Sequence, residues 1–357
     1  MENIEYNSTQ IKLKIWLKMA YKKIKIANLL SEFAASENAS DNVAQNANLR
    51  AFKVLMNALG VSMSEAQRLI DKGRLFCNGE VVSAKNEILR GEIELISYEN
   101  APRGQKPIFD NQNFAVFDKQ SGILSHPNGR NCAYSLCDEI WHLYGAQAGV
   151  AHRLDRETSG LILVAKDKKT QTIFKTLFEK RLVKKEYLAL VSGQTPLEFS
   201  VDLPINSACD EVKTRMRLCP LSEGGKEART EFKRLCYFSE QDLLNLSREI
   251  QLGKGFDFSK GASLLLARPL TGRQHQIRLH LFASGFAILG EPLYGLAKAD
   301  IERILDKQMS VAERVSLTGA TRLCLHSNRL AFEFGGKSYD ILSQRDIRAE
   351  FLRALSL

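Results

Sequence analysis

One sixteen-residue stretch, residues 152–167, constrains this chain more than any other part of its 357 residues. It begins with polar residues around Asp155, which lies between Arg153 and Arg156, and it continues into the apolar segment 161–165. The apolar run predicts a buried strand, and a polar loop held against such a strand is a rigid mount for a reactive group. The two arginines would keep Asp155 ionised and would attract a polyanion. The stretch therefore predicts an anionic nucleophile presented to a negatively charged substrate.

The composition favours a nucleic acid as that substrate. The chain has 50 Lys and Arg residues against 41 Asp and Glu residues, which gives a formal net charge of +9. The basic residues are clustered: residues 12–25 hold six lysines and no acid, and residues 166–185 hold eight basic residues against two acidic ones. Such clusters favour RNA or DNA over a membrane surface as the partner.

The cysteines and histidines predict neither a metal site nor a disulfide framework. Seven cysteines and six histidines are scattered, and no pair has the spacing of a zinc knuckle or a redox motif. We therefore expect reduced thiols and no metal site. No apolar run reaches membrane-spanning length, and the N-terminus lacks the apolar core of a secretory signal. We expect a cytoplasmic, monomeric protein that does not bind membranes.

The first hundred residues divide into three parts. Residues 1–34 read as a basic extension, and residues 35–48 are small, polar and without periodicity, as in a flexible linker. Residues 49–98 predict a small α/β unit of two helices followed by short strands, in which Ser62 or Ser64 caps the second helix. The Asn78-Gly79 pair between two strands predicts a type I′ turn.

Part of this small unit resembles a known RNA-binding module. The order of helix, glycine and hairpin over residues 63–82 is similar to that of S4-type modules. The resemblance implies that Arg68, Lys72 and Arg74 contact structured RNA. A generic helix–hairpin adaptor is the alternative, because residues 48–98 carry seven basic and six acidic residues and are nearly neutral.

The larger remainder, residues 105–357, predicts a single α+β domain. Strands outnumber helices and do not alternate with them regularly, which favours a mostly antiparallel sheet. We expect strands over 114–117, 187–191 and 263–267, a helix over 274–284, and a helix capped by Thr170 that carries Phe174 on its inner face. The segment 237–260 reads as a loop insertion.

Two residues outside the opening stretch could join Asp155 in a site. Arg278 falls one turn into the helix after a glycine-led turn, where it is either solvated or buried against a carboxylate, for which Asp155 is the candidate. Tyr187 lies in a predicted strand, where it either packs in the core or offers a nucleobase a stacking face and a phenol. A glycosidase would need a second acidic cluster at a set separation, which the sequence does not indicate.

These segments together resemble the RluA-like family of pseudouridine synthases, which isomerise uridine in RNA. The resemblance covers residues 110–330 and is carried by five segments in family order: 117–127, 152–160, 225–230, 271–280 with 290–295, and 322–326. The departures are small. Gln120-Ser121 replaces the usual Pro-Ala, Gln274 stands where Thr is usual, and Glu291 stands where Asp is usual.

The resemblance implies roles for single residues. Asp155 is expected to be the nucleophile, Arg278 its ion-pair partner and Tyr187 the residue that faces the base, while Arg153 enters the stack that the flipped uridine vacates. Further RNA contacts are expected from Arg156, Arg273 and His275. The expected target is structured ribosomal RNA of the large subunit, with transfer RNA as the alternative and a non-catalytic ribosome-assembly factor as a different class of function.

Overall fold

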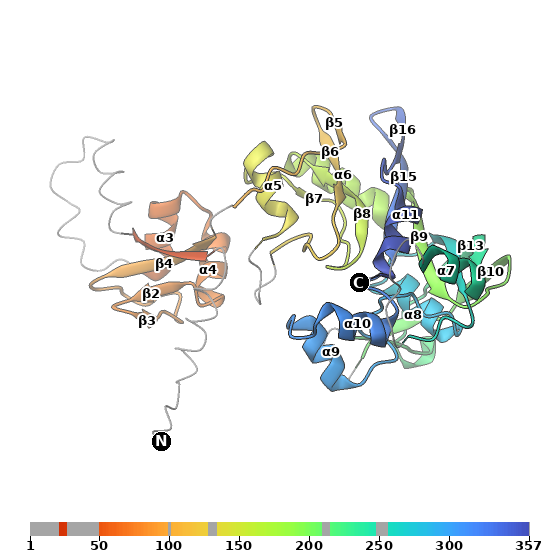
Figure 1. The fold of residues 1–357 in the computed structure, drawn as a ribbon. Coiled ribbons are helices and arrows are strands. Elements are labelled where there is room, and N and C mark those ends of the chain that lie inside the picture. The colour runs from red at the N-terminus through yellow and green to blue at the C-terminus, as the bar shows by residue number, and fades with distance from the viewer. Residues whose placement is uncertain are drawn as a thin grey trace, which may run out of the picture. The chain divides into compact units, whose positions relative to one another are not determined.

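The computed structural model describes residues 21–26, 50–98, 101–127, 134–208, 215–247 and 256–356. The chain forms two compact units, one of Met1–Pro102 with Pro127–Tyr134 and one of Arg103–His126 with Ser135–Leu357 (Figure 1). The predicted linker over 35–48 and most of the predicted extension over 1–34 lie outside the described residues.

The smaller unit packs two helices on a four-stranded sheet. Its elements are β1 (Tyr21–Lys25), α3 (Ala51–Leu59), α4 (Met63–Asp71), β2 (Leu75–Cys77), β3 (Glu80–Val81) and β4 (Ile93–Tyr98), with strand order β1-β4-β2-β3. Strand β1 comes from the segment that the sequence placed in the basic extension, and it pairs antiparallel with β4.

Local signals set the elements of the smaller unit. Of the two candidate caps, Ser62 is the one that caps α4, in a reciprocal capping box with Glu65. Asn78 and Gly79 both have positive φ, 50° and 83°, as the predicted type I′ turn requires. The helices bury Val54, Leu55 and Ile70 against the sheet, so a single small core holds the unit together.

The larger unit is an α+β structure built on one ten-stranded sheet, as predicted. The path of the sheet is β10-β13-β14-β9-β15-β8-β6-β5, and β16 and β7 pair with β15 and β8. Among the described strand pairs of this sheet, β15 and β8 run parallel and the others run antiparallel. Its strands are β5 (Phe109–Asp110), β6 (Phe114–Lys119), β7 (Gly149–Val150), β8 (Ser159–Ala165), β9 (Lys184–Ser192), β10 (Glu198–Asp202), β13 (Arg229–Phe238), β14 (Ala262–Pro269), β15 (Leu325–Phe334) and β16 (Lys337–Leu342).

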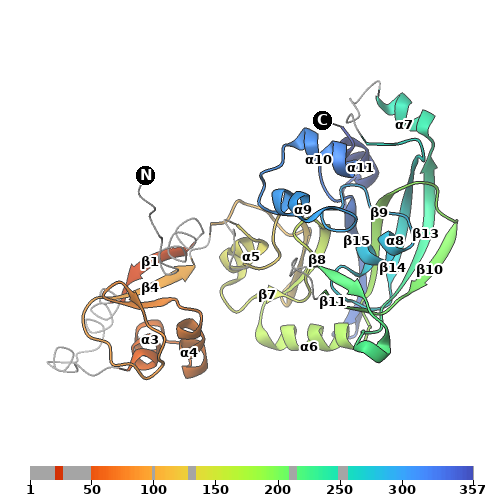
Figure 2. The same ribbon diagram turned by 90° about the horizontal axis from the view of Figure 1, so that it is seen from below.

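Helices and two short strands complete the larger unit. A small hairpin pairs β11 (Ile205–Ser207) with β12 (Met216–Leu218). The helical elements are α5 (Leu136–Tyr144), α6 (Lys168–Glu179), the 3₁₀ turn Leu221–Glu223, α7 (Glu240–Ser247), α8 (Gln276–Ala283), α9 (Lys298–Leu305), α10 (Val311–Thr318) and α11 (Ile347–Ala354). Figures 1 and 2 both show α9 and α10 side by side, and an ion pair between Arg303 and Glu313 joins them.

The sheet is buried on both faces where β8 crosses it, which explains the unbroken apolar run of the sequence. Successive strand residues point to opposite faces. Leu161 and Leu163 face a core that contains Phe174 of α6. Ile162 and Val164 face a second core, to which α5, α8 and α11 contribute. A strand covered on both faces needs apolar residues at every position, so residues 161–165 form the predicted buried strand.

Two predictions about helices are wrong in detail. Helix α6 is capped by Asp167, whose carboxylate accepts from the backbone N–H of Thr170, so Thr170 is the third residue of the helix rather than its cap. The segment 237–260 is not simply a loop, because residues 240–247 form α7, at whose start Ser239 and Asp242 exchange hydrogen bonds. Both cases follow from a side-chain oxygen that satisfies free N–H groups at a helix start.

Gly160 permits the parallel contact between β8 and β15. Its φ is +109°, and a Cβ atom at this position would lie 2.2 Å from the carbonyl oxygen of Ser327. Only glycine tolerates both the backbone conformation and the contact. Asp155 lies five residues before this point, so Gly160 helps to determine where its loop leaves the sheet.

Three kinds of feature are absent from the described residues: disulfides, membrane-crossing helices and metal-binding clusters. The five cysteines in the described ranges form no disulfide. Among the same residues, no helix has the length and apolar character that crossing a membrane requires, and no three His, Cys, Asp or Glu side chains are grouped as a metal site.

Candidate active site

The loop that carries Asp155 is bound to the segment 119–125 by a series of hydrogen bonds. The Ser125 hydroxyl donates to the Leu154 carbonyl at 2.8 Å and accepts from the Leu154 N–H at 3.1 Å. The Ser121 hydroxyl donates to the Glu157 carbonyl at 2.7 Å. These contacts hold the backbone on both sides of Asp155, so the carboxylate is mounted on a loop of fixed shape.

Lys119 adds a buried cation to this support. Its side chain is fully buried, and Nζ donates to the carbonyl oxygens of Gln120, Ile123 and Arg156 at 3.0, 2.8 and 3.1 Å. Burial lowers the pKa of Lys119 to about 7, although the nearby carboxylates of Asp155 and Glu157 favour the charged form. The lysine therefore joins the upstream motif to the Asp155 loop.

Arg278 lies between two carboxylates, as the expected ion pair with Asp155 requires. Its Nη1 donates to Oδ2 of Asp155 at 2.8 Å, while Nε and Nη2 form a bidentate pair with Glu291 at 2.9 and 2.6 Å. The Arg278 and Glu291 side chains are each 4% exposed, whereas that of Asp155 is 26% exposed. The guanidinium is thus fixed by Glu291 and presents its remaining edge to Asp155.

Asp155 is held in its ionised form. Burial alone would raise its pKa, but the neighbouring His275 and Arg278 favour the carboxylate more strongly, so the pKa of Asp155 lies below its ordinary value. The sequence attributed this effect to Arg153 and Arg156, and that prediction is wrong. Arg153 is exposed, and Arg156 donates to the Leu305 carbonyl at 3.4 Å.

His275, which was expected to contact RNA, lies beside the Asp155 carboxylate. Its Nε2 is 3.7 Å from Oδ2 of Asp155, and its Nδ1 is 3.1 Å from the Tyr294 hydroxyl. Burial lowers the pKa of His275 to about 4, which makes the imidazole neutral at pH 7. The residue is therefore part of the carboxylate's immediate surroundings.

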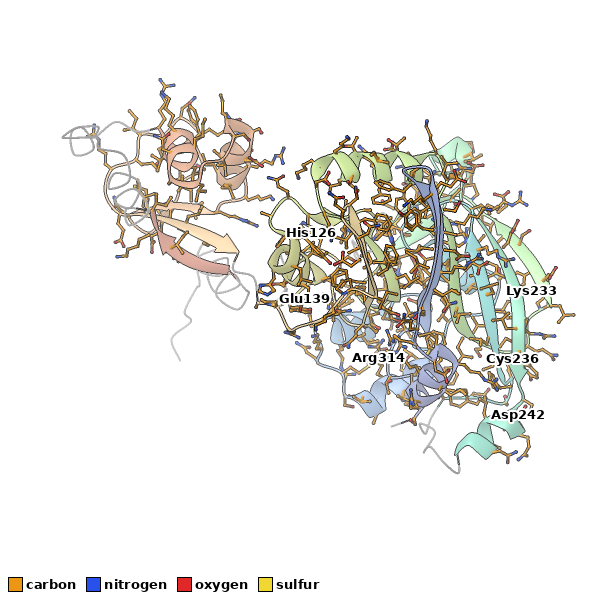
Figure 3. The ribbon with its side chains drawn as sticks, turned by 90° about the horizontal axis from the view of Figure 1, so that it is seen from above. His126, Glu139, Lys233, Cys236, Asp242 and Arg314 are labelled. Carbon is orange, nitrogen blue, oxygen red and sulfur yellow. The ribbon has the colours of Figure 1, made fainter. Side chains whose placement is uncertain are left out.

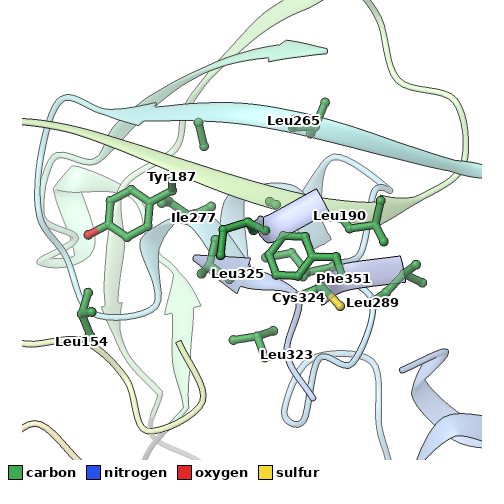
Figure 4. Close-up of a cluster of buried hydrophobic side chains, with 14 of the residues drawn as sticks. Leu154, Tyr187, Leu190, Leu265, Ile277, Leu289, Leu323, Cys324, Leu325 and Phe351 are labelled. Atoms are coloured by element: carbon green, nitrogen blue, oxygen red, sulfur yellow. The ribbon is translucent and has the colours of Figure 1, made fainter. Parts of the chain in front are cut away.

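Tyr187 lies in β9 at one end of the main core cluster. Figure 4 shows its hydroxyl directed away from the aliphatic side chains of that cluster, with Leu154 on a separate loop. The residue is 9% exposed and interacts electrostatically with Asp155. Burial raises the pKa of Tyr187 to about 12, so the phenol keeps its proton at neutral pH.

The residue after Arg156 ties the loop to a distant helix. Glu157 forms a bidentate ion pair with Arg314 of α10 and accepts from the Leu323 N–H at 3.3 Å. In Figure 3, Arg314 of α10 lies far from Lys233 of β13, the strand next to the sheet edge that β10 forms. Arg314 thus anchors the far end of the Asp155 loop.

Of the other predicted RNA-contacting residues, Arg273 belongs to the larger unit, and Arg68, Lys72 and Arg74 belong to the smaller one. Arg273 lies in the turn before α8, where its Nε donates to the Glu227 carbonyl at 2.9 Å. Arg68 and Lys72 are exposed and Arg74 is half-buried in the smaller unit.

Sequence reasoning missed four residues that shape this site: Lys119, Glu291, Tyr294 and Arg314. A signal existed for Glu291, because a guanidinium has five donors and a buried one needs more than one carboxylate. Glu291 was noted only as a departure from the family pattern. Lys119 and Arg314 carry no such signal, because a lysine or arginine in a sequence is normally expected at the surface.

Comparison with known proteins assigns the chain. A family model described as RNA pseudouridylate synthase matches residues 113–283. An RNA pseudouridine synthase of Helicobacter pylori, described as uncharacterized, is 35% identical over 311 residues, which cover 86% of this chain and 94% of that one. The chain belongs to the RNA pseudouridine synthase family. It is an isomerase that acts on RNA.

Other relatives of this pseudouridine synthase are more distant. The ribosomal large subunit pseudouridine synthase D of Nitrosomonas europaea is 32% identical over 200 residues, which cover 55% of this chain and 51% of that one. The solved structure of human RNA pseudouridylate synthase domain containing 1 covers 67% of this chain and 83% of its own, with a TM-score of 0.50 and 20% identity. That structure supports the α+β fold.

Proposed function

We propose that this pseudouridine synthase isomerises specific uridines of large-subunit ribosomal RNA, with Asp155 as its nucleophile. The proposal rests on one observation above all. The Asp155 carboxylate is ionised and fixed through Oδ2 by Arg278, yet its side chain keeps 26% of its surface exposed. A fixed and accessible anion on a rigid loop is what nucleophilic attack requires.

The reaction rearranges bonds within one nucleotide. The target uridine is flipped out of its helix at a cost of roughly a few kcal/mol, and Arg153, which is exposed, fills the vacated stack. Asp155 assists cleavage of the bond between N1 and the ribose C1′, at the base or at the sugar. The base rotates, C5 bonds to C1′, C5 loses its proton and N1 gains one. No electrons are transferred to or from the substrate, so the scheme requires neither cofactor nor metal.

Tyr187 has a restricted role in this scheme. With a pKa of about 12, its phenol is not a phenolate that could remove the C5 proton at neutral pH. We assign it to packing against the flipped base and to orienting a proton acceptor. We also propose that Arg156, Arg273 and His275 contribute RNA contacts.

The smaller unit is proposed to bind RNA as an S4-like module over residues 49–98. Its helix–hairpin order supports the proposal, as do the exposed Arg68 and Lys72 and the half-buried Arg74. Phosphate contacts of this kind position an RNA rather than read its sequence. We further propose that the enzyme works as a monomer in the cytoplasm, where ribosomal RNA is its substrate.

Pseudouridine mapping tests the function directly. Total RNA from a deletion strain should lack at least one pseudouridine of large-subunit ribosomal RNA, and the wild-type gene should restore it. Asp155→Asn should bind the RNA and restore nothing, because the amide is not a nucleophile. A mark missing from transfer RNA alone would overturn the ribosomal assignment, and restoration by Asp155→Asn would overturn the role of Asp155. Release of free uracil would indicate a glycosidase instead.

A further inference from the structure

A chain of polar contacts leads from the backbone of β12 to the nucleophile. The Met216 N–H donates to the Tyr294 hydroxyl oxygen at 3.2 Å, and that oxygen lies 3.1 Å from Nδ1 of His275. Nε2 of His275 lies 3.7 Å from Oδ2 of Asp155. The imidazole therefore stands between a phenol and a carboxylate, with one ring nitrogen toward each.

The phenol end of the chain fixes the position of one proton. The Tyr294 oxygen already accepts from Met216, and its own proton needs an acceptor. Burial raises the pKa of Tyr294 above its ordinary value, so the phenol is protonated. Nδ1 of His275 supplies the acceptor only if it carries no hydrogen. A neutral imidazole whose Nδ1 accepts must carry its hydrogen on Nε2.

The carboxylate end of the chain independently favours the same arrangement. An ionised Asp155 can only accept hydrogen bonds, so the nitrogen that faces it is stabilised when it carries a hydrogen. The opposite tautomer would direct a lone pair at an anion. A doubly protonated imidazolium is disfavoured because burial lowers the pKa of His275 to about 4.

The backbone at His275 is built to hold this orientation. The residue precedes α8 and adopts the left-handed conformation, with φ of 55°, which is uncommon for residues other than glycine. Gln276 stabilises the turn, because its Oε1 accepts from the Thr271 hydroxyl at 2.6 Å and from the Arg273 N–H at 3.0 Å. A strained backbone held by its surroundings is a common way of aiming a side chain at a functional site.

We propose that Tyr294 locks His275 in the Nε2–H tautomer, so that His275 and Arg278 both point donors at Oδ2 of Asp155 and leave Oδ1 to react. Within the part of the chain that the structure describes, the hydrogen bond from Arg278 to this carboxylate ends on Oδ2, and the 3.7 Å contact from Nε2 of His275 is to the same oxygen. The 3.7 Å contact is longer than a hydrogen bond and closes when RNA binds, as catalytic hydrogen bonds often do. The inference rests on the proposed role of Asp155, and it makes Tyr294 and His275 positioning residues.

Nitrogen NMR of the full-length protein tests the tautomer without any RNA. The six histidines are labelled with ¹⁵N, and His275 is assigned from the signals lost in His275→Gln. We expect Nδ1 to show the shift of an unprotonated nitrogen and Nε2 that of a protonated one. In Tyr294→Phe, which keeps the ring and removes the hydroxyl, the two shifts should move toward each other as the tautomers mix.

Activity measurements on an unmodified transcript of large-subunit ribosomal RNA complete the test. Tyr294→Phe should lower kcat about tenfold and leave KM unchanged. Without the Tyr294 hydroxyl, His275 is no longer aligned on Asp155, and the transition state loses stabilisation of about one hydrogen bond. Tyr144→Phe is the matched control, since it also removes a hydroxyl that is bonded, at 3.0 Å to Asp110, on an exposed part of the same unit. This control should change kcat less than twofold and leave the His275 shifts in place.

Several results would overturn the inference. A protonated Nδ1 in the wild type, unchanged shifts in Tyr294→Phe, or a changed tautomer with unchanged kcat would each contradict it. Failure of the proposed function would give a different experimental result. If Asp155→Asn remains active, the nucleophile is wrong, whereas the nitrogen shifts still report whether Tyr294 sets the tautomer.

Discussion

The two units of this pseudouridine synthase differ in whether their charged side chains are exposed or buried. In the smaller unit the ion pairs are at least partly exposed, as in Lys25–Glu92 with exposed fractions of 60% and 51%. Among the described residues, the buried charged side chains all belong to the larger unit: Asp118, Lys119, Asp138, Glu139, Arg278 and Glu291. The six histidines of the chain also lie in the larger unit. The smaller unit is thus stabilised by apolar packing, and the larger one must in addition stabilise buried charge.

The difference shows where function imposes a cost on stability. A buried ion network is weak evidence for stability, because desolvation offsets most of the attraction. The network around Asp155 is better explained by the need to hold one carboxylate oxygen in place. Three substitutions and one change of pH sharpen this comparison, in order of decreasing effect.

Removing the central cation should have the largest effect. Arg278→Met leaves the buried carboxylate of Glu291 and the partly exposed one of Asp155 without their shared cation, and breaking such a buried pair costs about 3–5 kcal/mol of unfolding free energy. Urea unfolding followed by Trp141 fluorescence measures it. The control is Arg68→Met on the exposed face of α4, which should change the unfolding free energy little. If both substitutions changed the unfolding free energy equally, burial of charge would not distinguish the two units.

Acid should destabilise the larger unit through its histidines. His152 accepts a hydrogen bond at Nε2 from the Leu163 N–H at 3.1 Å, and burial lowers the pKa of His152 to about 3. Between pH 6.5 and about 3 the unfolded chain binds a proton that the folded chain does not, so stability is lost as the pH falls. At pH 5 this histidine alone should cost about 2 kcal/mol.

Hydrogen exchange in the full chain, read by segment, measures the effect of acid. Protection of β8 should fall between pH 7 and pH 5, after correction for the intrinsic exchange rate, and protection of β4 should fall less. His152→Gln, which keeps an acceptor but does not titrate, should reduce the loss in β8. An identical loss in this variant would remove His152 from the explanation.

A cap in the smaller unit should have an intermediate effect. Ser62→Ala removes the hydroxyl that accepts from the Glu65 N–H, and the loss should cost about 1 kcal/mol. The second hydrogen bond of the capping box, from the Ser62 N–H to the Glu65 carboxylate, remains. Exchange rates in α4 report this loss within the full chain. Ser64→Ala is the matched control, since Ser64 does not cap the helix, and it should have a much smaller effect.

An exposed ion pair in the larger unit should matter least. Arg329 forms a bidentate pair with Asp340 at 2.7 and 2.6 Å, but their side chains are 35% and 55% exposed. Arg329→Gln should change the unfolding free energy by about 0.5 kcal/mol or less. A loss close to that of Arg278→Met would mean that membership of the unit, rather than burial, decides the cost.

The parts of the fold that sequence predicts are those that depend on neighbours in the chain. The Asn78-Gly79 turn and the cap at Ser62 follow from local chemistry, and the strand over 161–165 follows from its apolar run. The sequence predicted Thr170 as a cap and not Asp167. Both side chains can accept a hydrogen bond, and only the three-dimensional path of the chain decides between them.

The sequence predicts the part of the site in which a buried charge requires a partner of opposite charge. Arg278 in a buried helix required an anion, and Asp155 was the correct choice. The contact of Glu157 with Arg314 joins residues 157 positions apart and leaves no pattern in the sequence. His275 was expected to contact RNA, and its place beside Asp155 depends on a left-handed backbone that sequence does not reveal for a histidine.

Gly160 has a consequence for how mutational scans of this enzyme should be interpreted. Any side chain there collides with the backbone of Ser327, so every substitution should be eliminated by selection as completely as substitutions of Asp155. A scan that measures only loss of function would then not distinguish Gly160 from Asp155. Measuring protein abundance as well as activity distinguishes the two positions. Variants at Gly160 should have low abundance in the cell, whereas Asp155→Asn should accumulate as a folded, inactive protein.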